Sequence, residues 1–232
     1  MKTPMKTVAA GALLALAVSA AHADNVPENT LRVGMYYVQY HSTADDISGP
    51  YVPSGLNLHI NAIETLYLAY VRRLSEHFDL ELAAGAPPTT KTEGRGPATL
   101  GSVPYNGQVI STAKWFAPTL LLNYKFLDDS YALRPYLGIG VNYANFYDRR
   151  STAAGNAASG GPTSISLPSS VGVAGTVGVS YRLPERWSLY LSYSMSEVKS
   201  KLTADTAGVI RTSQISFGPR ALVIAAGYSF GK

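Results

Sequence analysis

The chain contains no cysteine, which excludes a disulfide framework, a thiolate metal site and a lipid-anchoring cysteine. After residue 23 it also lacks an apolar run as long as a spanning helix, which needs about 20 residues. Neither sign of charge is in large excess. The formal net charge is +4, and two of the positive residues, Lys2 and Lys6, lie near the N-terminus. So weak a basic bias argues against nucleic acid as a partner.

The first 23 residues have the pattern of a secretory signal. Lys2 and Lys6 flank the start of an apolar stretch, Val8–Ala20, and Ala21-His22-Ala23 matches the Ala-x-Ala cleavage pattern. The stretch is too short to span a bilayer and no stop-transfer pattern follows, so a signal is favoured over an N-terminal anchor. We therefore predict a signal peptide over residues 1–23 and a mature chain of residues 24–232.

Eight stretches of the mature chain alternate apolar and polar residues. From Trp187 onward, for example, one parity carries Trp, Leu, Leu, Tyr and Met, and the other carries four serines and a tyrosine. A strand places successive side chains on opposite faces, so one face suits hydrocarbon and the other a polar interior. The predicted strands span residues 31–41, 58–71, 77–86, 113–126, 132–147, 169–182, 187–201 and 211–230.

The connections between these stretches alternate in length. Residues 72–76, 127–131 and 183–186 make short turns, whereas residues 42–57, 87–112, 148–168 and 202–210 make long loops. Short periplasmic turns and long extracellular loops are typical of outer-membrane barrels. The long loops are rich in Gly, Pro, Ser, Thr and Asn, so they are expected to form no core.

Aromatic residues of the lipid-facing parity gather at the short-turn end, where amphipathic rings favour the headgroup level. They are Phe78, Tyr124, Phe126, Tyr181, Trp187, Tyr228 and Phe230. A soluble β-sandwich also alternates, but it gives no reason for such a ring. We therefore predict an all-β fold, an eight-stranded antiparallel transmembrane β-barrel over residues 24–232 in the bacterial outer membrane. Its partners would be outer-membrane lipid and, during biogenesis, periplasmic chaperones and the barrel-assembly machinery.

Two charged residues share the lipid-facing parity. Glu64 lies in line with Leu66 and Leu68, so either it sits above the membrane or a β-bulge switches parity there. Arg220 is tolerable if it lies at the outer interface.

The opposite parity lists the barrel interior. Six charged residues are predicted to point inward near the periplasmic end and to pair as a plug, because buried charges must pair; they are Arg32, Asp79, Glu81, Lys125, Arg134 and Arg182. A purely stabilising role for these charges is an equal possibility. Higher in the barrel the predicted lining is apolar and includes Val38, Trp115, Leu121, Phe146, Phe217 and Val223.

Patterns for enzymes and cofactors are weak. Gly172, Gly175 and Gly178 match a dinucleotide fingerprint only in spacing, because they lie within an alternating strand and precede no helix. His41, His59 and His77 have no metal-ligand spacing. No G-x-S-x-G elbow is present. We therefore expect no catalytic site, no metal site and no cofactor.

Two segments resemble the OmpW family of eight-stranded outer-membrane proteins. They are Lys114–Phe146, with Arg134-Pro135-Tyr136, Gly138-x-Gly140 and Asn142-Tyr143, and Leu66–Pro87. Ala221–Phe230 is similar to that family's closing strand, although Gly231-Lys232 follow the usual terminal aromatic. The resemblance implies passage of small hydrophobic molecules, since the family includes relatives that help alkanes and aromatic compounds to cross the outer membrane. The loops match poorly, so loop-borne specificity is not transferable.

Three functions are open at this point. The first is passive uptake of small hydrophobic solutes, which enter the apolar upper lumen and leave sideways into the bilayer because the charges block the lower end. Pro118 and Pro219 could open the strand ladder for such an exit, although a place at strand entries is favoured. The second is a surface receptor or interaction protein acting through its long loops, chiefly 87–112 with Lys91 and Arg95. The third is a membrane enzyme, for which no nucleophile and base can be identified.

Overall fold

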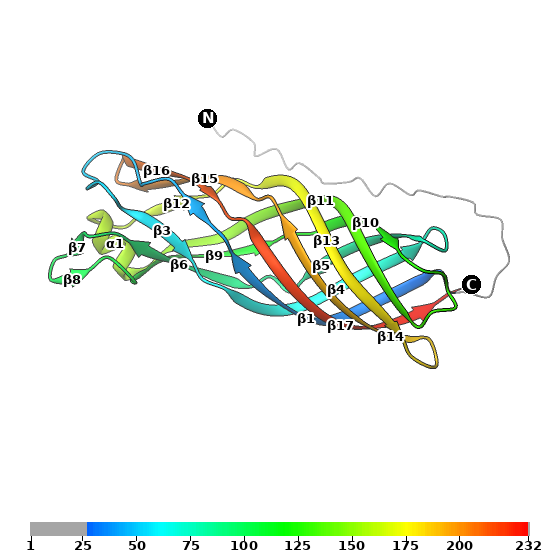
Figure 1. The fold of residues 1–232 in the computed structure, drawn as a ribbon. Helices are drawn as coiled ribbons and strands as arrows, with labels where there is room; N and C mark the ends of the chain where they lie inside the picture. The colour runs from blue at the N-terminus through cyan, green and yellow to red at the C-terminus, as the bar shows by residue number, and fades with distance from the viewer. Residues whose placement is uncertain (1–26, 232) are drawn as a thin grey trace, which may run out of the picture.

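The computed structural model describes residues 27–231, so the predicted signal peptide lies outside the described residues. Eight long strands form a closed antiparallel barrel, as predicted (Figure 1). β10 pairs with both β5 and β11, and β1 pairs with both β4 and β17, so the sheet has no edge. The barrel strands are β1 (Asn29–Tyr40), β4 (Ile63–Arg73), β5 (Phe78–Gly85), β10 (Thr119–Lys125), β11 (Leu133–Ser151), β13 (Ser170–Arg182), β14 (Trp187–Ser196) and β17 (Pro219–Phe230).

The long connections extend the barrel beyond one end, at the left of Figure 1. One sheet continues upper β11 through β9, β6 and β3, and a second has the order β12-β15-β16-β2. The elements are β2 (Thr43–Ala44), β3 (Asn57–Ile60), β6 (Thr89–Arg95), β7 (Thr99–Leu100), β8 (Val103–Pro104), β9 (Val109–Phe116), α1 (Ala153–Ser159), β12 (Ser164–Ser166), β15 (Lys199–Thr206) and β16 (Val209–Ser216). We call this part the extension.

Four predicted strands each contain two strands in the structure. The breaks fall at residues 61–62, 117–118, 197–198 and 217–218, where the barrel meets the extension. Pro118 lacks a ladder donor, and Gly218 has a φ of +47°, which breaks the regular extended backbone. Apolar and polar residues alternate on both sides of each break. The sequence pattern therefore predicted one continuous strand where the structure has two.

The expectation that the long connections form no core is wrong. Buried apolar side chains of the extension pack together between its two sheets and the top of the barrel; they are Leu58, Ile60, Ala144, Phe146, Leu167, Val198, Ile215 and Phe217. Leu58 and Ile60 lie between β1 and β4, Leu167 lies between β11 and β13, and Val198, Ile215 and Phe217 lie between β14 and β17, whereas Ala144 and Phe146 belong to β11. Composition therefore underestimated what the connections bury together.

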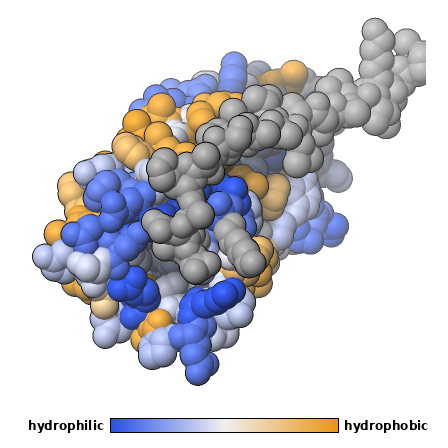
Figure 2. Space-filling view, turned by 90° about the vertical axis from the view of Figure 1, so that its right-hand side faces the viewer, coloured by the Kyte–Doolittle hydropathy of each residue, from blue (hydrophilic) through white to orange (hydrophobic). Residues whose placement is uncertain are grey.

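The alternation of faces holds in the barrel wall. Leu222 and Leu120 are 45% and 42% exposed, whereas Val223 and Leu121 are 5% and 4% exposed. Aromatic rings gather on the outward face at the short-turn end, where Trp187 and Tyr228 have ring centroids 5.1 Å apart. Figure 2 looks onto this end and shows hydrophilic side chains around the rim, with hydrophobic ones along the flank.

The two outward charges both lie near the extension. The pairing of β1 with β4 runs without a register shift, so the bulge alternative for Glu64 is wrong. Glu64 is exposed opposite Tyr37, near the outer end of β4. Arg220 is exposed at the start of β17, with Nη1 3.2 Å from His41 Nε2.

Among the described residues, none of the helices has the length and apolar character needed to cross a membrane.

Candidate functional site

A buried carboxylate network lies inside the lower barrel. Arg32, from β1, is 2% exposed and donates from Nη1 to Glu81 Oε2 at 2.7 Å. The same oxygen accepts from Asn123 Nδ2 at 2.7 Å, and Oε1 accepts from the Tyr67 hydroxyl at 2.5 Å. The Arg32 guanidinium also lies 3.7 Å from the ring centroid of Tyr190. Each charge thus has several partners, as a buried ion pair requires.

A second ion pair lies beside the first. Lys125 Nζ, from β10, is 2.5 Å from Asp79 Oδ2, and Asp79 is 1% exposed. Asp79 and Glu81 are two residues apart on β5, so the strand points both carboxylates into the barrel. We call Arg32, Asp79, Glu81 and Lys125 the floor.

The structure corrects two of the six predicted plug residues. Arg134 is buried, but it pairs with Asp129 of the adjacent turn and donates from Nη2 to Glu76 O at 2.8 Å and Leu127 O at 2.7 Å. It therefore braces the short turns and does not bind Asp79 or Glu81. Arg182 ends β13, is exposed, and forms no ion pair with the residues of the described part. Arg182 has the inward parity, but at the end of a strand an inward-pointing side chain reaches water.

Glycine makes room for the rings above the floor. A Cβ on Gly178 would lie 2.6 Å from Tyr136 Cζ, a distance that side chains do not tolerate. Tyr136 is 3% exposed and packs with Tyr67 and Tyr190 around the Arg32 guanidinium. Gly178 of β13 therefore serves packing inside the barrel.

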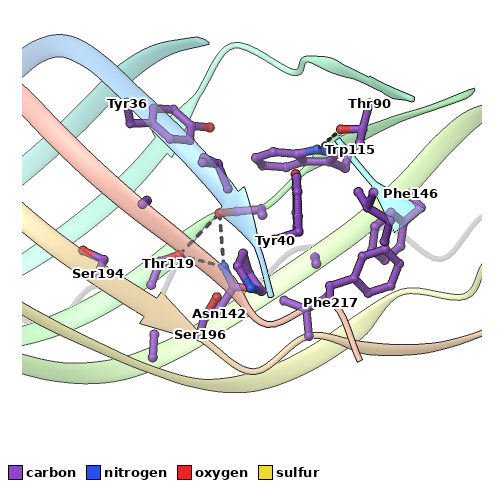
Figure 3. A pocket seen from close by; sticks show the side chains of 18 of the residues that line it. Tyr36, Tyr40, Thr90, Trp115, Thr119, Asn142, Phe146, Ser194, Ser196 and Phe217 are labelled. Carbon is purple, nitrogen blue, oxygen red and sulfur yellow. Dashed lines mark hydrogen bonds between the residues drawn. The ribbon is translucent and has the colours of Figure 1, made fainter. Parts of the chain in front are cut away.

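Above the floor lies a cavity of about 160 Å³. Its lower end is bounded by Tyr67 and Glu81 and its outer end by Leu167 and Arg149. Figure 3 shows Trp115, Phe146 and Phe217 around it. All six residues predicted to line the upper lumen lie on its wall: Val38, Trp115, Leu121, Phe146, Phe217 and Val223.

The upper wall of the cavity is aromatic and aliphatic. Phe146 from β11 and Phe217, which follows β16, stack with ring centroids 5.1 Å apart and an interplanar angle of 25°. Ile215, Leu167 and Val198 complete this wall. Sequence reasoning missed all three. Val198 and Ile215 share the inward parity of the predicted strands 187–201 and 211–230, so the alternation could have identified them. Leu167 lies in the predicted loop 148–168, where no alternation marks an inward face.

Polar groups also line the cavity. Trp115 Nε1 donates to Thr90 Oγ1 at 2.9 Å, and Ser194 Oγ donates to Thr176 Oγ1 at 2.9 Å. Asn142, from β11, donates from Nδ2 to Thr119 Oγ1 at 2.7 Å (Figure 3). Asn142 has the inward parity of strand 132–147, so the alternation pattern could have identified it.

Hydrogen bonds and an ion pair connect the segments at the outer end of the cavity. Arg149 Nη1 donates to Phe146 O and to Leu167 O, both at 3.1 Å, and so links β11 to the segment after β12. Nearby, Lys114 Nζ lies 3.1 Å from Asp148 Oδ2, and this contact is the main reason that the pKa of Asp148 is lowered. The carboxylate is therefore ionised at neutral pH.

The remaining candidate residues do not converge on a site. Within residues 27–231 no group of three or more His, Cys, Asp or Glu side chains could hold a metal ion. Lys91 and Arg95 lie on β6, which is part of the ordered extension, and Arg95 Nη2 is 3.6 Å from Glu93 Oε2.

Comparisons with known proteins agree with this architecture. The model of the OmpW family matches residues 31–230. Outer membrane protein W of Salmonella typhimurium is 28% identical over 229 residues, covering 97% of this chain and 98% of that protein. The dibenzothiophene metabolism operon protein PahQ of Pseudomonas aeruginosa is 32% identical over 127 residues, covering 52% of this chain and 54% of that protein. The crystal structure of OprG from Pseudomonas aeruginosa superposes with a TM-score of 0.79 at 22% identity, covering 89% of this chain and 97% of that one.

Proposed function

The chain belongs to the OmpW family, and we propose that it is an outer-membrane channel for the passive uptake of small hydrophobic molecules. Its relatives are outer-membrane barrels and not enzymes, so the bacterial outer membrane is its location.

The main support is the position of the cavity directly above a closed floor. An apolar solute that enters among Trp115, Phe146 and Phe217 leaves water, which is favourable by about 25 cal/mol per Å² of apolar surface buried. A hydrated ion or a sugar gains nothing there and meets the Arg32–Glu81 pair below. The arrangement therefore admits apolar solutes and holds back polar ones.

The name of one relative supports the same class of solute. PahQ is named for an operon of dibenzothiophene metabolism, and dibenzothiophene is an apolar aromatic compound. The apolar aromatic wall formed by Phe146 and Phe217 suits an apolar aromatic ring.

Exit sideways into the bilayer fits the strand pairing. The ladder between β5 and β10 ends at Ala83 and Thr119, and the ladder between β6 and β9 begins at Thr89 and Lys114. Among the described residues no strand pair joins the two segments in between, 84–88 and 115–118. Ala84 and Ala117 in these segments line the cavity. We infer that solute leaves there. Pro219 pairs with Tyr40 and is the first residue of β17. It therefore occupies the strand-entry position and opens no gap in the ladder.

Uptake by whole cells tests the proposal. Cells that lack the protein should accumulate toluene more slowly than cells that carry it, and both should exclude a disaccharide equally. Trimming whole loops cannot separate uptake from surface binding, because the extension forms the upper cavity wall. Substitution at an exposed tip can: Tyr51 is 89% exposed, so Tyr51→Ser should leave toluene uptake unchanged. If the protein does not accelerate uptake at all, the proposal is wrong and the loop-receptor alternative is favoured.

A further inference from the structure

Asn142, a residue of the cavity wall, carries a buried hydrogen-bond acceptor that has no partner among the described residues. The residue is 4% exposed, and Nδ2 contacts Thr119 Oγ1 at 2.7 Å and Ala117 O at 3.3 Å. A backbone carbonyl can only accept, so the contact with Ala117 fixes which end of the amide is nitrogen. Asn142 Oδ1 is then buried with no hydrogen-bond partner among the described residues.

An unmet buried acceptor is costly, and several neighbouring polar groups avoid that cost. Ser194 and Trp115 both donate to threonine hydroxyls within the barrel. Glu81 accepts from Arg32, Asn123 and Tyr67. Asn142 Oδ1 therefore differs from these groups, although the Tyr40 hydroxyl on the same cavity wall is also buried without a partner among the described residues. The barrel does not use this acceptor, which leaves it for a solute that brings a donor.

The rest of the cavity specifies the body of that solute. Phe146 and Phe217 offer aromatic faces on the same cavity, with Trp115 on another part of its wall (Figure 3). Aromatic rings prefer such neighbours in offset or edge-to-face arrangements. A cavity of about 160 Å³ matches a single ring, since a cavity of about 150 Å³ in another protein takes up benzene.

We propose that the cavity selects small monocyclic aromatic compounds that carry one hydrogen-bond donor, of which simple phenols are the type. The ring lies against the apolar wall, and a small rotation of the Asn142 amide lets the hydroxyl donate to Oδ1, which is buried in the structure. This inference rests on the proposed uptake function and adds the class of solute to it. A hydrocarbon of the same shape enters the same cavity but leaves the Asn142 acceptor unmet.

The test compares p-cresol with p-xylene, which differ by a hydroxyl in place of a methyl group. The chain has two tryptophans, so Trp187→Phe leaves Trp115 as a fluorescent reporter inside the cavity. Binding is measured with this parent variant in lipid nanodiscs. Each affinity is divided by the partition of the same compound into protein-free nanodiscs.

The parent should prefer p-cresol over p-xylene by about tenfold after this normalisation, the factor that one well-placed hydrogen bond supplies. Asn142→Leu in the same background should abolish the preference, because it removes the acceptor at similar side-chain volume. Ser194→Ala is the matched control. It removes a cavity hydroxyl that already has a partner, so the preference should persist.

Three outcomes would overturn the inference. If both compounds bind the parent equally well, the selectivity is absent while hydrophobic uptake stands. If the preference survives in Asn142→Leu, another group recognises the hydroxyl. If neither compound changes the Trp115 emission, the cavity takes no small aromatic and the proposed function fails with the inference. The parent comparison decides the matter even if Asn142→Leu does not fold.

Discussion

Replacing Arg32 with methionine should lower the free energy of unfolding by about 3–5 kcal/mol, because it leaves Glu81 as an unpaired charge inside the barrel. The substitution also removes the contact between the Arg32 guanidinium and the Tyr190 ring. The measurement is urea-induced unfolding in lipid, followed by tryptophan fluorescence and by the heat-modified migration of folded barrel in gels.

Two variants control this experiment. Arg182→Met removes an exposed arginine at the end of β13, so its effect should stay within about 0.5 kcal/mol. Arg32→Met combined with Glu81→Leu removes both charges and should recover part of the lost stability. If Arg32→Met is as mild as Arg182→Met, the floor charges are solvated and cannot close the barrel.

The second large effect is expected for Val223→Asp, which should slow the uptake of toluene by about tenfold or more. Val223 is 5% exposed on the cavity wall, so the new carboxylate would hold water where an apolar solute must pass. The lipid-facing surface is unchanged, and the barrel should still assemble. Uptake is measured in whole cells and divided by the amount of folded barrel.

Leu222→Asp is the matched control, one residue away on the opposite face. Leu222 is 45% exposed on the outer surface, so an aspartate there would face lipid and not the cavity. It should destabilise the folded barrel by up to about 2 kcal/mol and so impair assembly. Barrel that does assemble should take up toluene at the normal rate. Normal uptake by folded Val223→Asp protein would count against a passage through this cavity.

The contrast between Leu222 and Val223 also shows what the sequence could predict. The two-residue period of a strand is a local rule, and a membrane barrel enforces it because lipid lies on one face. The alternation therefore predicted the strands, the closed barrel and the wall positions of Val38, Leu121 and Val223. It also placed Arg32, Asp79 and Glu81 inside the barrel.

The rule fails where the chain leaves the barrel wall. Asp129, the partner of Arg134, lies in a turn, and turn residues have no parity. Arg182 follows the inward parity, but at a strand end that direction leads to solvent. Leu167 reaches the cavity from a segment that the sequence predicts as a loop, where no alternation marks an inward face, whereas Ile215 shares the inward parity of Phe217. The resemblance to the OmpW family could not supply these residues, because the loops match poorly.

The most direct test of the account is to locate an apolar solute in the protein by anomalous diffraction from crystals soaked with 1,4-dibromobenzene. The account predicts bromine peaks inside the barrel, between the Phe146–Phe217 stack and the Tyr67–Glu81 contact, and none below the floor. Peaks confined to the lipid-facing surface, or a continuous row of peaks past Arg32 to the periplasmic end, would contradict it.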